Sequence, residues 1–142
     1  MKNYPQNYID GAWVDSKGGR KHTVINPATE GPASEITIGT AADVDDAVIA
    51  ARRAFETFSL TTKAERVALL QRITEEYAKR IPDIAEAIAT EMGCPIAMAR
   101  TAQAGSGMGH LGNALKALEA YDFREKIGDN TVVREPIFSR KS

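Results

Sequence analysis

The sequence has one cysteine and two histidines among its 142 residues, and this scarcity excludes several kinds of site. Cys94 has no second cysteine for an internal disulfide or a multi-cysteine metal cage. His22 and His110 lie far apart in the sequence and lack zinc-ligand spacing. The acidic run Asp43–Asp46 lacks the glycine and the terminal glutamate of a calcium loop. We therefore expect no zinc or calcium site of a known pattern.

The sequence also lacks an excess of charge of one sign and any long apolar run. Eighteen basic residues balance nineteen acidic ones, which leaves a net charge of -1 and excludes a polycationic nucleic-acid binder. No apolar run approaches the roughly 18 to 20 residues of a membrane-spanning helix. The first residues, Met1–Asn7, lack the apolar stretch of a secretory signal. With 43% hydrophobic and 26% charged residues, we expect a soluble, cytoplasmic chain of one domain's length.

The first forty residues have the pattern of short strands and turns. Asp10-Gly11 tolerates the positive φ angles of a two-residue hairpin. Ser16–Gly19 and Gly31-Pro32 predict further turns, and Asn26-Pro27 stops a strand because proline cannot donate to a ladder. The expected strands cover residues 8–9, 12–14, 23–25 and 35–38.

From Thr40 to about residue 121 the pattern is helical. The segments Thr40–Asp43 and Thr62–Glu65 each have the spacing of a capping box, which starts a helix. Pro82 predicts a restart of the second helix, because proline suits a first turn and disrupts an interior. Gly93 predicts the end of that helix, and the alanine-rich stretch 96–121 predicts another.

The last part predicts a turn at Gly128–Asn130 and a strand over Thr131–Val133 that Pro136 ends. The expected architecture is α/β, with a β-rich head, about four helices and one returning strand.

The segment Gly107–Gly112 matches the G-x-G-x-x-G pattern of dinucleotide-binding sites. In such a site the glycines let the backbone approach a pyrophosphate at a helix N-terminus. That site needs a strand immediately before the motif, whereas the preceding Ala97–Ala104 is helix-prone. We favour close helix packing as the reason for these glycines, with phosphate binding as the alternative.

Cys94 is a candidate nucleophile only if a basic group lies near it, because the thiolate is the reactive form. Neither histidine is close to it in sequence, so we favour a small residue packed in a turn. From the residues alone, no active site is recognisable.

Seven short segments together resemble the beginning of an NAD(P)-dependent aldehyde dehydrogenase. Their order and spacing over residues 7–137 carry the resemblance more than any one of them does. The segments are Tyr8–Val14, Val24–Thr29, Ala41–Val48, Ala51–Phe55, Glu65–Leu70, Glu91–Pro95 and Val133–Ile137.

The resemblance implies an α/β enzyme with a Rossmann-like cofactor domain, a catalytic domain and a small oligomerisation sheet. In that family a cysteine attacks the aldehyde, hydride passes to NAD or NADP, and water activated by a glutamate hydrolyses the thioester. Those residues and the cofactor motifs lie beyond the matching stretch. The resemblance therefore implies no catalytic and no cofactor-binding residue here, an incomplete Rossmann-like domain, and no activity or cofactor binding by this chain alone.

The resemblance also divides the chain and suggests one ion site. The matching segment covers residues 1–137 and a tail covers 138–142. Within the segment, 1–40 is the hairpin region, 41–123 is the helical region, and 124–137 is a strand towards the oligomerisation sheet. Some family members bind a monovalent cation through backbone carbonyls of the strand that aligns with Val24 and Ile25. The acidic ligand of those members aligns with Gln103, which has no carboxylate.

In the family, these helices pack on a sheet that later sequence supplies. The isolated chain would then leave apolar side chains partly uncovered, and we expect it to be marginally stable, self-associating or partly disordered. The side chains concerned are Leu69, Leu70, Ile73, Ile84, Ile88, Leu115 and Leu118.

Two alternatives to an enzyme segment stay open. The first is an assembly module that pairs with full-length dehydrogenase subunits through the strand Thr131–Val133, since an unpaired edge strand recruits other chains. The second is a small NAD-binding protein that uses Gly107–Gly112. The sequence does not identify the aldehyde, the choice between NAD and NADP, or the oligomer.

Overall fold

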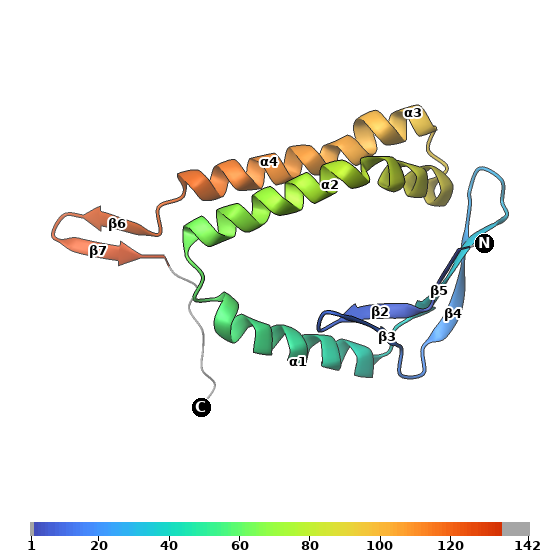
Figure 1. Ribbon diagram of the computed structural model, residues 1–142, viewed down its shortest axis with the longest axis horizontal. Coiled ribbons are helices and arrows are strands. Elements are labelled where there is room, and N and C mark those ends of the chain that lie inside the picture. The colour runs from blue at the N-terminus through green and yellow to red at the C-terminus, as the bar shows by residue number, and fades with distance from the viewer. Residues whose placement is uncertain (1, 135–142) are drawn as a thin grey trace.

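The computed structural model describes residues 2–134, and the strand end predicted at Pro136 and the tail 138–142 lie outside this range. The strands are β1 (Lys2–Tyr4), β2 (Gln6–Ile9), β3 (Ala12–Asp15), β4 (Arg20–Ile25), β5 (Pro32–Ile38), β6 (Arg124–Ile127) and β7 (Asn130–Val133). The helices are α1 (Ala41–Phe58), α2 (Lys63–Met92), α3 (Ile96–Met98), the π-helix η1 (Ala99–Gln103) and α4 (Ala104–Ala120). The α/β class is confirmed (Figure 1).

The β-rich head consists of a hairpin and a separate three-stranded sheet. Strands β2 and β3 pair around Asp10 and Gly11, whose φ angles of 54° and 79° confirm the predicted two-residue turn. In the sheet, β5 lies between β4, which is antiparallel to it, and β1, which is parallel to it. The turn predicted at Gly31-Pro32 is wrong by one residue, because Pro32 already begins β5. Proline is tolerated there as the first residue of a strand.

Both predicted capping boxes are present, at Thr40 with Asp43 and at Thr62 with Glu65. The predicted restart at Pro82 is wrong, because α2 continues through it from Lys63 to Met92. Proline removes one backbone hydrogen bond from a helix. On either side of Pro82, the side chains of Ile81 and Ile84 pack against the same buried cluster. This packing stabilises the helix where the backbone hydrogen bond is missing.

Helices α2 and α4 lie side by side and antiparallel, and they form the upper arm of the molecule (Figure 1). The small side chains of Ala85, Ala99 and Ala104 are fully buried where α2 meets η1 and α4. At the other end, the ammonium group of Lys63 donates to the carbonyl oxygens of Glu119 and Tyr121, at 2.6 and 3.0 Å. A cation at a helix C-terminus satisfies carbonyls that the helix leaves unpaired.

The chain after α4 forms a hairpin of two strands, β6 and β7, where the sequence predicted one returning strand. The missed strand contains Arg124, Glu125 and Lys126, and all four of its residues are exposed. Such a strand has no apolar alternation from which to predict it. The hairpin projects from the end of the helical arm (Figure 1).

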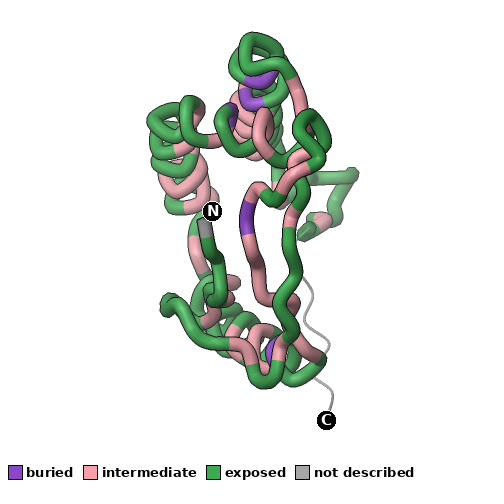
Figure 2. Tube along the Cα trace, turned by 90° about the vertical axis from the view of Figure 1, so that its right-hand side faces the viewer, coloured by how far each residue is buried: buried purple, intermediate pink, exposed green. Residues whose placement is uncertain are grey.

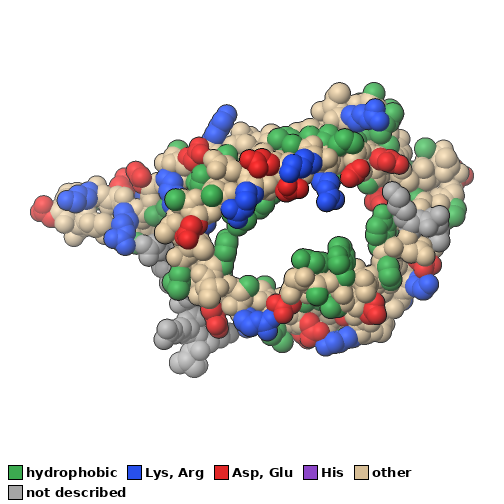
Figure 3. Space-filling view, in the orientation of Figure 1, with side chains coloured by type: hydrophobic (Ala, Val, Ile, Leu, Met, Phe, Trp, Pro, Cys, Tyr) green, Lys and Arg blue, Asp and Glu red, His purple; other side chains and the backbone are tan. Residues whose placement is uncertain are grey.

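The described elements form a frame around an open space. The β-rich head joins α1, α1 joins α2, and the end of α2 returns to the head (Figure 1). This last contact is close: a Cβ placed on Gly93 would lie 2.9 Å from Cγ of Pro27. Gly93 has a φ of 68°, which favours glycine, and it ends α2 as predicted. Figure 3 shows that the space between α1 and the arm of α2 and α4 passes through the molecule.

Little of this frame is buried, as the exposed trace in Figure 2 shows. Among the described residues, no large side chain is fully buried. The accessible surface of the chain is 10731 Å². A compact protein of 15.4 kDa has about 7,200 Å². The nine residues outside the described range can account for no more than about 1,600 Å² of this surface. At least about 2,000 Å² of surface is therefore exposed that a compact fold of this size would bury.

Candidate functional site

The glycine-rich segment lies in the interior of α4 and follows η1 instead of a strand. Tyr77 of α2 lies against Gly107, where an added Cβ would stand 2.1 Å from the tyrosine Oη. The Tyr77 hydroxyl donates to the carbonyl oxygen of Ala104 at 2.9 Å. The predicted close packing is thus confirmed at Gly107. Gly109 and Gly112 have nothing within 4 Å of such a Cβ, so for them the packing prediction is wrong within the described chain.

Cys94 lies in the turn between α2 and α3. Its thiol donates weakly to the carbonyl oxygen of Pro95, at 3.6 Å, and its side chain packs against the buried alanine cluster. This confirms a small residue packed in a turn. Neither histidine contributes to a metal cluster, since the described residues hold no group of three or more His, Cys, Asp or Glu that could bind a metal.

The carboxylate of Asp43, in the first turn of α1, is buried. It accepts hydrogen bonds from the Ser16 hydroxyl at 2.5 Å and from the Lys17 N–H at 2.8 Å. It also accepts from the N–H and the hydroxyl of Thr40, at 2.7 and 2.9 Å. These donors, Ser16 first, hold the pKa of Asp43 far below its usual range. The group is a structural clamp between the 16–19 turn and α1.

The hydrogen bonds from Thr40 were predictable from the capping-box spacing. Those from Ser16 and Lys17 were not, because no sequence pattern links a turn to a helix that begins more than twenty residues later. The only signal was Ser16 itself, a residue type whose hydroxyl often bonds locally in turns.

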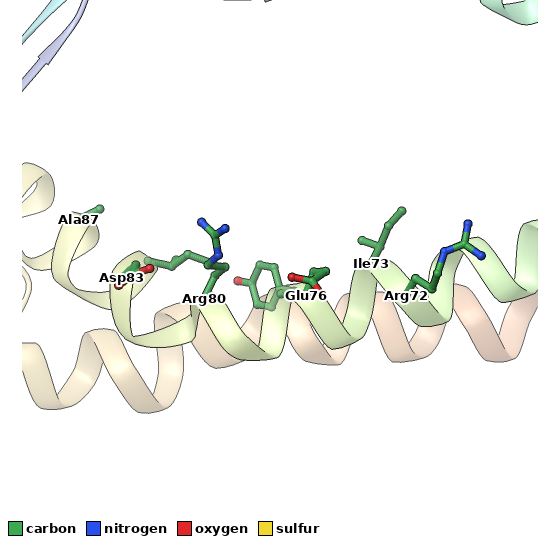
Figure 4. Close-up of a pocket in the computed structure, with 8 residues that line it drawn as sticks. Arg72, Ile73, Glu76, Arg80, Asp83 and Ala87 are labelled. Atoms are coloured by element: carbon green, nitrogen blue, oxygen red, sulfur yellow. The ribbon is translucent and has the colours of Figure 1, made fainter. Parts of the chain in front are cut away.

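One side of α2 borders the open space of the frame, and we call it the open face of α2. The side chains labelled in Figure 4 point away from α4, and together with Tyr77 and Ile84, which also contact the helices packed on α2, they line a shallow depression of about 780 Å³. The depression has a wall on one side only, because every lining residue belongs to α2. The residues of the open face are Arg72, Ile73, Glu76, Tyr77, Arg80, Asp83, Ile84 and Ala87.

The open face mixes apolar and charged groups of both signs. Ile73 is 42% exposed. Glu76 pairs with Lys79 at 2.6 Å, and this ammonium group lowers the pKa of the Glu76 carboxyl. A one-walled surface of this kind does not enclose a small molecule, since such ligands need a concave site that buries most of their surface. It suits another layer of polypeptide.

A second depression, of about 280 Å³, lies where the sheet meets the C-terminal part of α2. It has two walls, one from β1 and β5 and one from α2, and Glu86 and Glu91 line the helical wall. The buried hydroxyl of Ser34 has no hydrogen-bond partner among the described residues.

The predicted cation ligands Val24 and Ile25 end β4, and a register shift between β4 and β5 falls between them. The shift leaves Ala33 of β5 opposite no residue of β4, as in a β-bulge. Gln103, the residue that replaces the acidic ligand, ends η1. The cation site stays a prediction.

No helix of the described chain is both long enough and apolar enough to cross a membrane.

Comparison with known proteins gives one consistent result. Residues 13–138 match the model of the aldehyde dehydrogenase family. The chain is 46% identical over 137 residues to a 3-succinoylsemialdehyde-pyridine dehydrogenase from a Pseudomonas species, which covers 96% of this chain and 29% of that protein.

Solved structures agree with the sequence comparison. An aldehyde dehydrogenase from Bartonella henselae is 38% identical and superposes with a TM-score of 0.88, covering 91% of this chain and 27% of that one. A mutant of aldehyde dehydrogenase C from Pseudomonas syringae, in complex with NAD+ and octanal, is also 38% identical, with a TM-score of 0.83 over 87% of this chain and 25% of that one. The chain thus spans less than a third of the length of each of these proteins.

Proposed function

The chain belongs to the aldehyde dehydrogenase family, and we propose that it serves as the N-terminal structural segment of an enzyme that oxidises an aldehyde to a carboxylic acid. In this proposal the oxidant is NAD or NADP, and a cysteine outside this chain carries the thioester. NAD is favoured because the related structure from Pseudomonas syringae holds NAD+. The proposed location is the cytoplasm.

The described residues do not fit a nicotinamide dinucleotide. The glycines that would cradle a pyrophosphate lie inside α4, and one of them, Gly107, lies against Tyr77. No free helix N-terminus follows a strand at that point. We therefore derive no catalytic step from this chain and assign it a supporting role.

The observation that carries this proposal is the open frame itself. Helices α1 and α2 lie on either side of an open space, and in an α/β fold helices on two sides cover the faces of one sheet. A sheet covered on both faces is apolar throughout. The open face of α2 is the type of surface that such a sheet would bury. By itself the chain is then inactive, because it holds one part of a layered fold.

A chimaera tests this proposal. Residues 1–137 replace the aligned segment of the 46% identical Pseudomonas dehydrogenase, and the formation of NADH from an aldehyde is followed by absorbance. We expect activity within about tenfold of the parent enzyme, since most of the catalytic machinery is unchanged. The isolated chain should form no NADH at the same concentration. Oxidation of aldehydes by the isolated chain would contradict the proposal.

A second candidate function is the assembly module that pairs with full-length subunits or with itself. The observation in its favour is the β6–β7 hairpin, which projects from the helical arm and pairs only within itself among the described strands. A lone two-stranded hairpin is marginally stable, and a further strand at its edge would stabilise it. Binding of the chain to an intact dehydrogenase, lost on replacement of Thr131 by Pro in β7, would support this candidate.

The predicted cation site has a separate test. If Val24 and Ile25 ligate a monovalent cation, the melting temperature of the chimaera should rise in Na⁺ or K⁺ relative to a tetramethylammonium salt of equal ionic strength, because a ligand that binds only the folded state stabilises it. Equal melting temperatures in all three salts would remove the cation site from the proposal.

A further inference from the structure

We propose that Asp10 and Gly11, at the tip of the β2–β3 hairpin, form a site of spontaneous covalent modification at which the aspartate converts to isoaspartate. The ion pair between Asp10 and Arg53 of α1 restrains this conversion. The inference concerns the chemistry of the hairpin and does not depend on the proposed function.

The conversion has two steps and needs no reagent besides water. In the first step the backbone nitrogen of Gly11 attacks Cγ of Asp10, a C–N bond forms, and the amide hydrogen leaves with the carboxyl hydroxyl as water. In the second step water adds to one of the two carbonyls of the five-membered imide. Addition at Cγ restores aspartate, whereas addition at the main-chain carbonyl leaves the backbone running through Cβ and Cγ. The net change is an isomerisation without a change in mass.

The sequence favours this reaction at one place. Asp10 is the one aspartate or asparagine of the chain that precedes a glycine. Glycine has no side chain to shield its own nitrogen, so the attack meets the least steric hindrance at this pair.

The attacking nitrogen is also unpartnered in the structure. The ladder of the hairpin ends at the pair of Ile9 and Ala12, and Gly11 lies in the turn beyond it. Within residues 2–134, the N–H of Gly11 makes no hydrogen bond. A Cβ added to Gly11 would meet nothing within 4 Å, so the turn is open to solvent there. The attack therefore breaks no backbone hydrogen bond of the hairpin.

The turn packs loosely on the rest of the chain. Strands β2 and β3 pair only with each other among the described strands, and a lone two-stranded hairpin is marginally stable. The hairpin lies beside α1 (Figure 1), and a depression of about 310 Å³ is lined by Asp10, Gly11 and small side chains of α1. The turn can therefore open locally without disrupting a packed core, and water reaches the imide.

Arg53 restrains the carboxyl group of Asp10. Its guanidinium donates a hydrogen bond to Oδ2, which holds the carboxyl group in one orientation, whereas the attack requires Cγ to approach the nitrogen of Gly11. The side chains of Arg53 and Asp10 are 62% and 58% exposed, and exposed ion pairs favour the paired state by only about fivefold or less. Arg53 thus slows the conversion without preventing it.

The product does not fit the turn. Isoaspartate adds a methylene group to the backbone of a two-residue loop that sets the register of both strands. Next to this loop, the rings of Tyr8 and Trp13 face each other across the strands, with their centroids 5.2 Å apart. We expect the conversion to separate these rings. The near-ultraviolet circular dichroism of Trp13, the single tryptophan of the chain, should then decrease.

The experiment incubates the chain for several weeks at neutral pH and physiological temperature. Peptides from each time point are separated by liquid chromatography, and electron-transfer fragmentation distinguishes isoaspartate from aspartate at equal mass. Asp129 is the control within the chain, because it also lies in a two-residue turn but precedes Asn130, which has a side chain and pairs with Ile127 in the ladder of β6 and β7. We expect isoaspartate to form at least about fivefold faster at Asp10 than at Asp129.

Three variants test the chemistry and the restraint. Asp10→Glu keeps the charge but would need a six-membered ring, so it should give no isomerised product. Arg53→Gln should raise the rate about two- to fivefold, since it removes the ion pair. Arg52→Gln is the matched control, because Arg52 makes no hydrogen bond or ion pair within the described residues. Circular dichroism at the incubation temperature checks that both arginine variants are folded to the same extent.

The outcomes separate the site from its restraint. Equal rates at Asp10 and Asp129, or no isoaspartate at either, would overturn the modification site. Equal rates in Arg53→Gln and Arg52→Gln would overturn the restraint by Arg53. A faster conversion in Arg53→Gln alone supports both and identifies the folded hairpin as the species that reacts, because an unfolded chain has no such ion pair.

Discussion

Four hydrogen bonds converge on the Asp43 carboxylate, and they come from the 16–19 turn as well as from Thr40, the N-cap residue of α1. Glu65 occupies the equivalent position in α2, but its donors are the N–H and hydroxyl of Thr62 alone. The capping box of Asp43 therefore also holds a distant turn, whereas the capping box of Glu65 acts only within its own helix.

We predict that Asp43→Asn lowers the melting temperature about twice as far as Glu65→Gln does. An asparagine keeps one acceptor oxygen and turns an NH₂ group towards donors, which leaves buried donors unsatisfied. Both variants are compared with the wild type by circular dichroism at pH 7. Equal shifts would show that the link to Ser16 contributes nothing.

The pH dependence follows from the direction of the shift. The pKa of Asp43 is lowered from the model-compound value of 3.8, so its contribution to stability is complete above that pH. The contribution is lost as the pH falls below 3.8, because protonation then favours the unfolded chain. The difference in melting temperature between wild type and Asp43→Asn should therefore stay constant from pH 7 to pH 5 and shrink below pH 4. A difference that shrinks between pH 7 and pH 5 would contradict this assignment.

Gly107 and Gly109 lie two residues apart in α4 and differ in what an added methyl group would meet. At Gly107 the Cβ meets the Tyr77 ring, and at Gly109 it meets nothing within 4 Å. We predict that Gly107→Ala costs about 1–3 kcal/mol through overpacking. Gly109→Ala should stabilise the chain by up to about 1 kcal/mol, because alanine is the better helix former. Urea unfolding of both variants measures whether each change lowers or raises the free energy of unfolding. A higher free energy of unfolding for Gly107→Ala would exclude the packing role.

At the scale of elements, α2 shows that tertiary packing overrides a local rule. Pro82 lacks the N–H that the helix would use, yet the helix continues because Ile81 and Ile84 pack on the buried cluster. We predict that Pro82→Ala raises the free energy of unfolding by about 2 kcal/mol, from the restored hydrogen bond and the better propensity. Ala78→Gly, one turn earlier in the same helix, serves as the control and should lower it by about 1 kcal/mol. No change on Pro82→Ala would mean that α2 bends to accommodate the proline without loss.

Most of these helices and strands were predictable from the residues near their ends. The others depend on contacts between residues far apart in the sequence or have no distinct pattern. The caps at Thr40 and Thr62, the Asp10-Gly11 turn and the end of α2 at Gly93 all depend on a few neighbouring residues, and all were predictable. Strand β1 was not, since it exists through parallel pairing with β5, some thirty residues away. The π-helix η1 was not either, because an alanine-rich stretch has the same pattern in both helical forms.

In the candidate sites, too, local features were predictable and contacts between distant residues were not. Close helix packing was predicted for the glycines of the 107–112 segment as a set, and it holds at Gly107, where the approaching group, Tyr77, comes from another helix. The open face of α2 was predicted in part, through Ile73 and Ile84, because the family resemblance implies that these side chains lose part of their cover in this chain. That these residues border an empty space depends on the path of the whole chain, which no local pattern contains.

For the whole molecule, the accessible surface is the quantity that decides stability. An unfolded chain of 15.4 kDa exposes about 22,000 Å², so folding to 10731 Å² buries about half of it. A compact domain of this length buries about 68%. Part of the missing burial is apolar surface, so the isolated chain lacks hydrophobic stabilisation that a compact domain has. Because ordinary domains are stable by only about 5–15 kcal/mol, we expect the free energy of unfolding of the isolated chain to be marginal.

We predict that the isolated chain unfolds with a broad transition at low denaturant and exposes apolar surface before it does so. Because the m-value scales with the surface exposed on unfolding, it should be about three quarters of that of a compact domain of equal length. Urea titration followed by circular dichroism gives the m-value, and the fluorescence of the dye ANS reports the exposed apolar surface. Light scattering over a concentration series then distinguishes self-association from a loose monomer. A monomer with a sharp transition, a full-sized m-value and no dye binding would mean that the frame closes on itself in solution, and the open face of α2 would then need no partner.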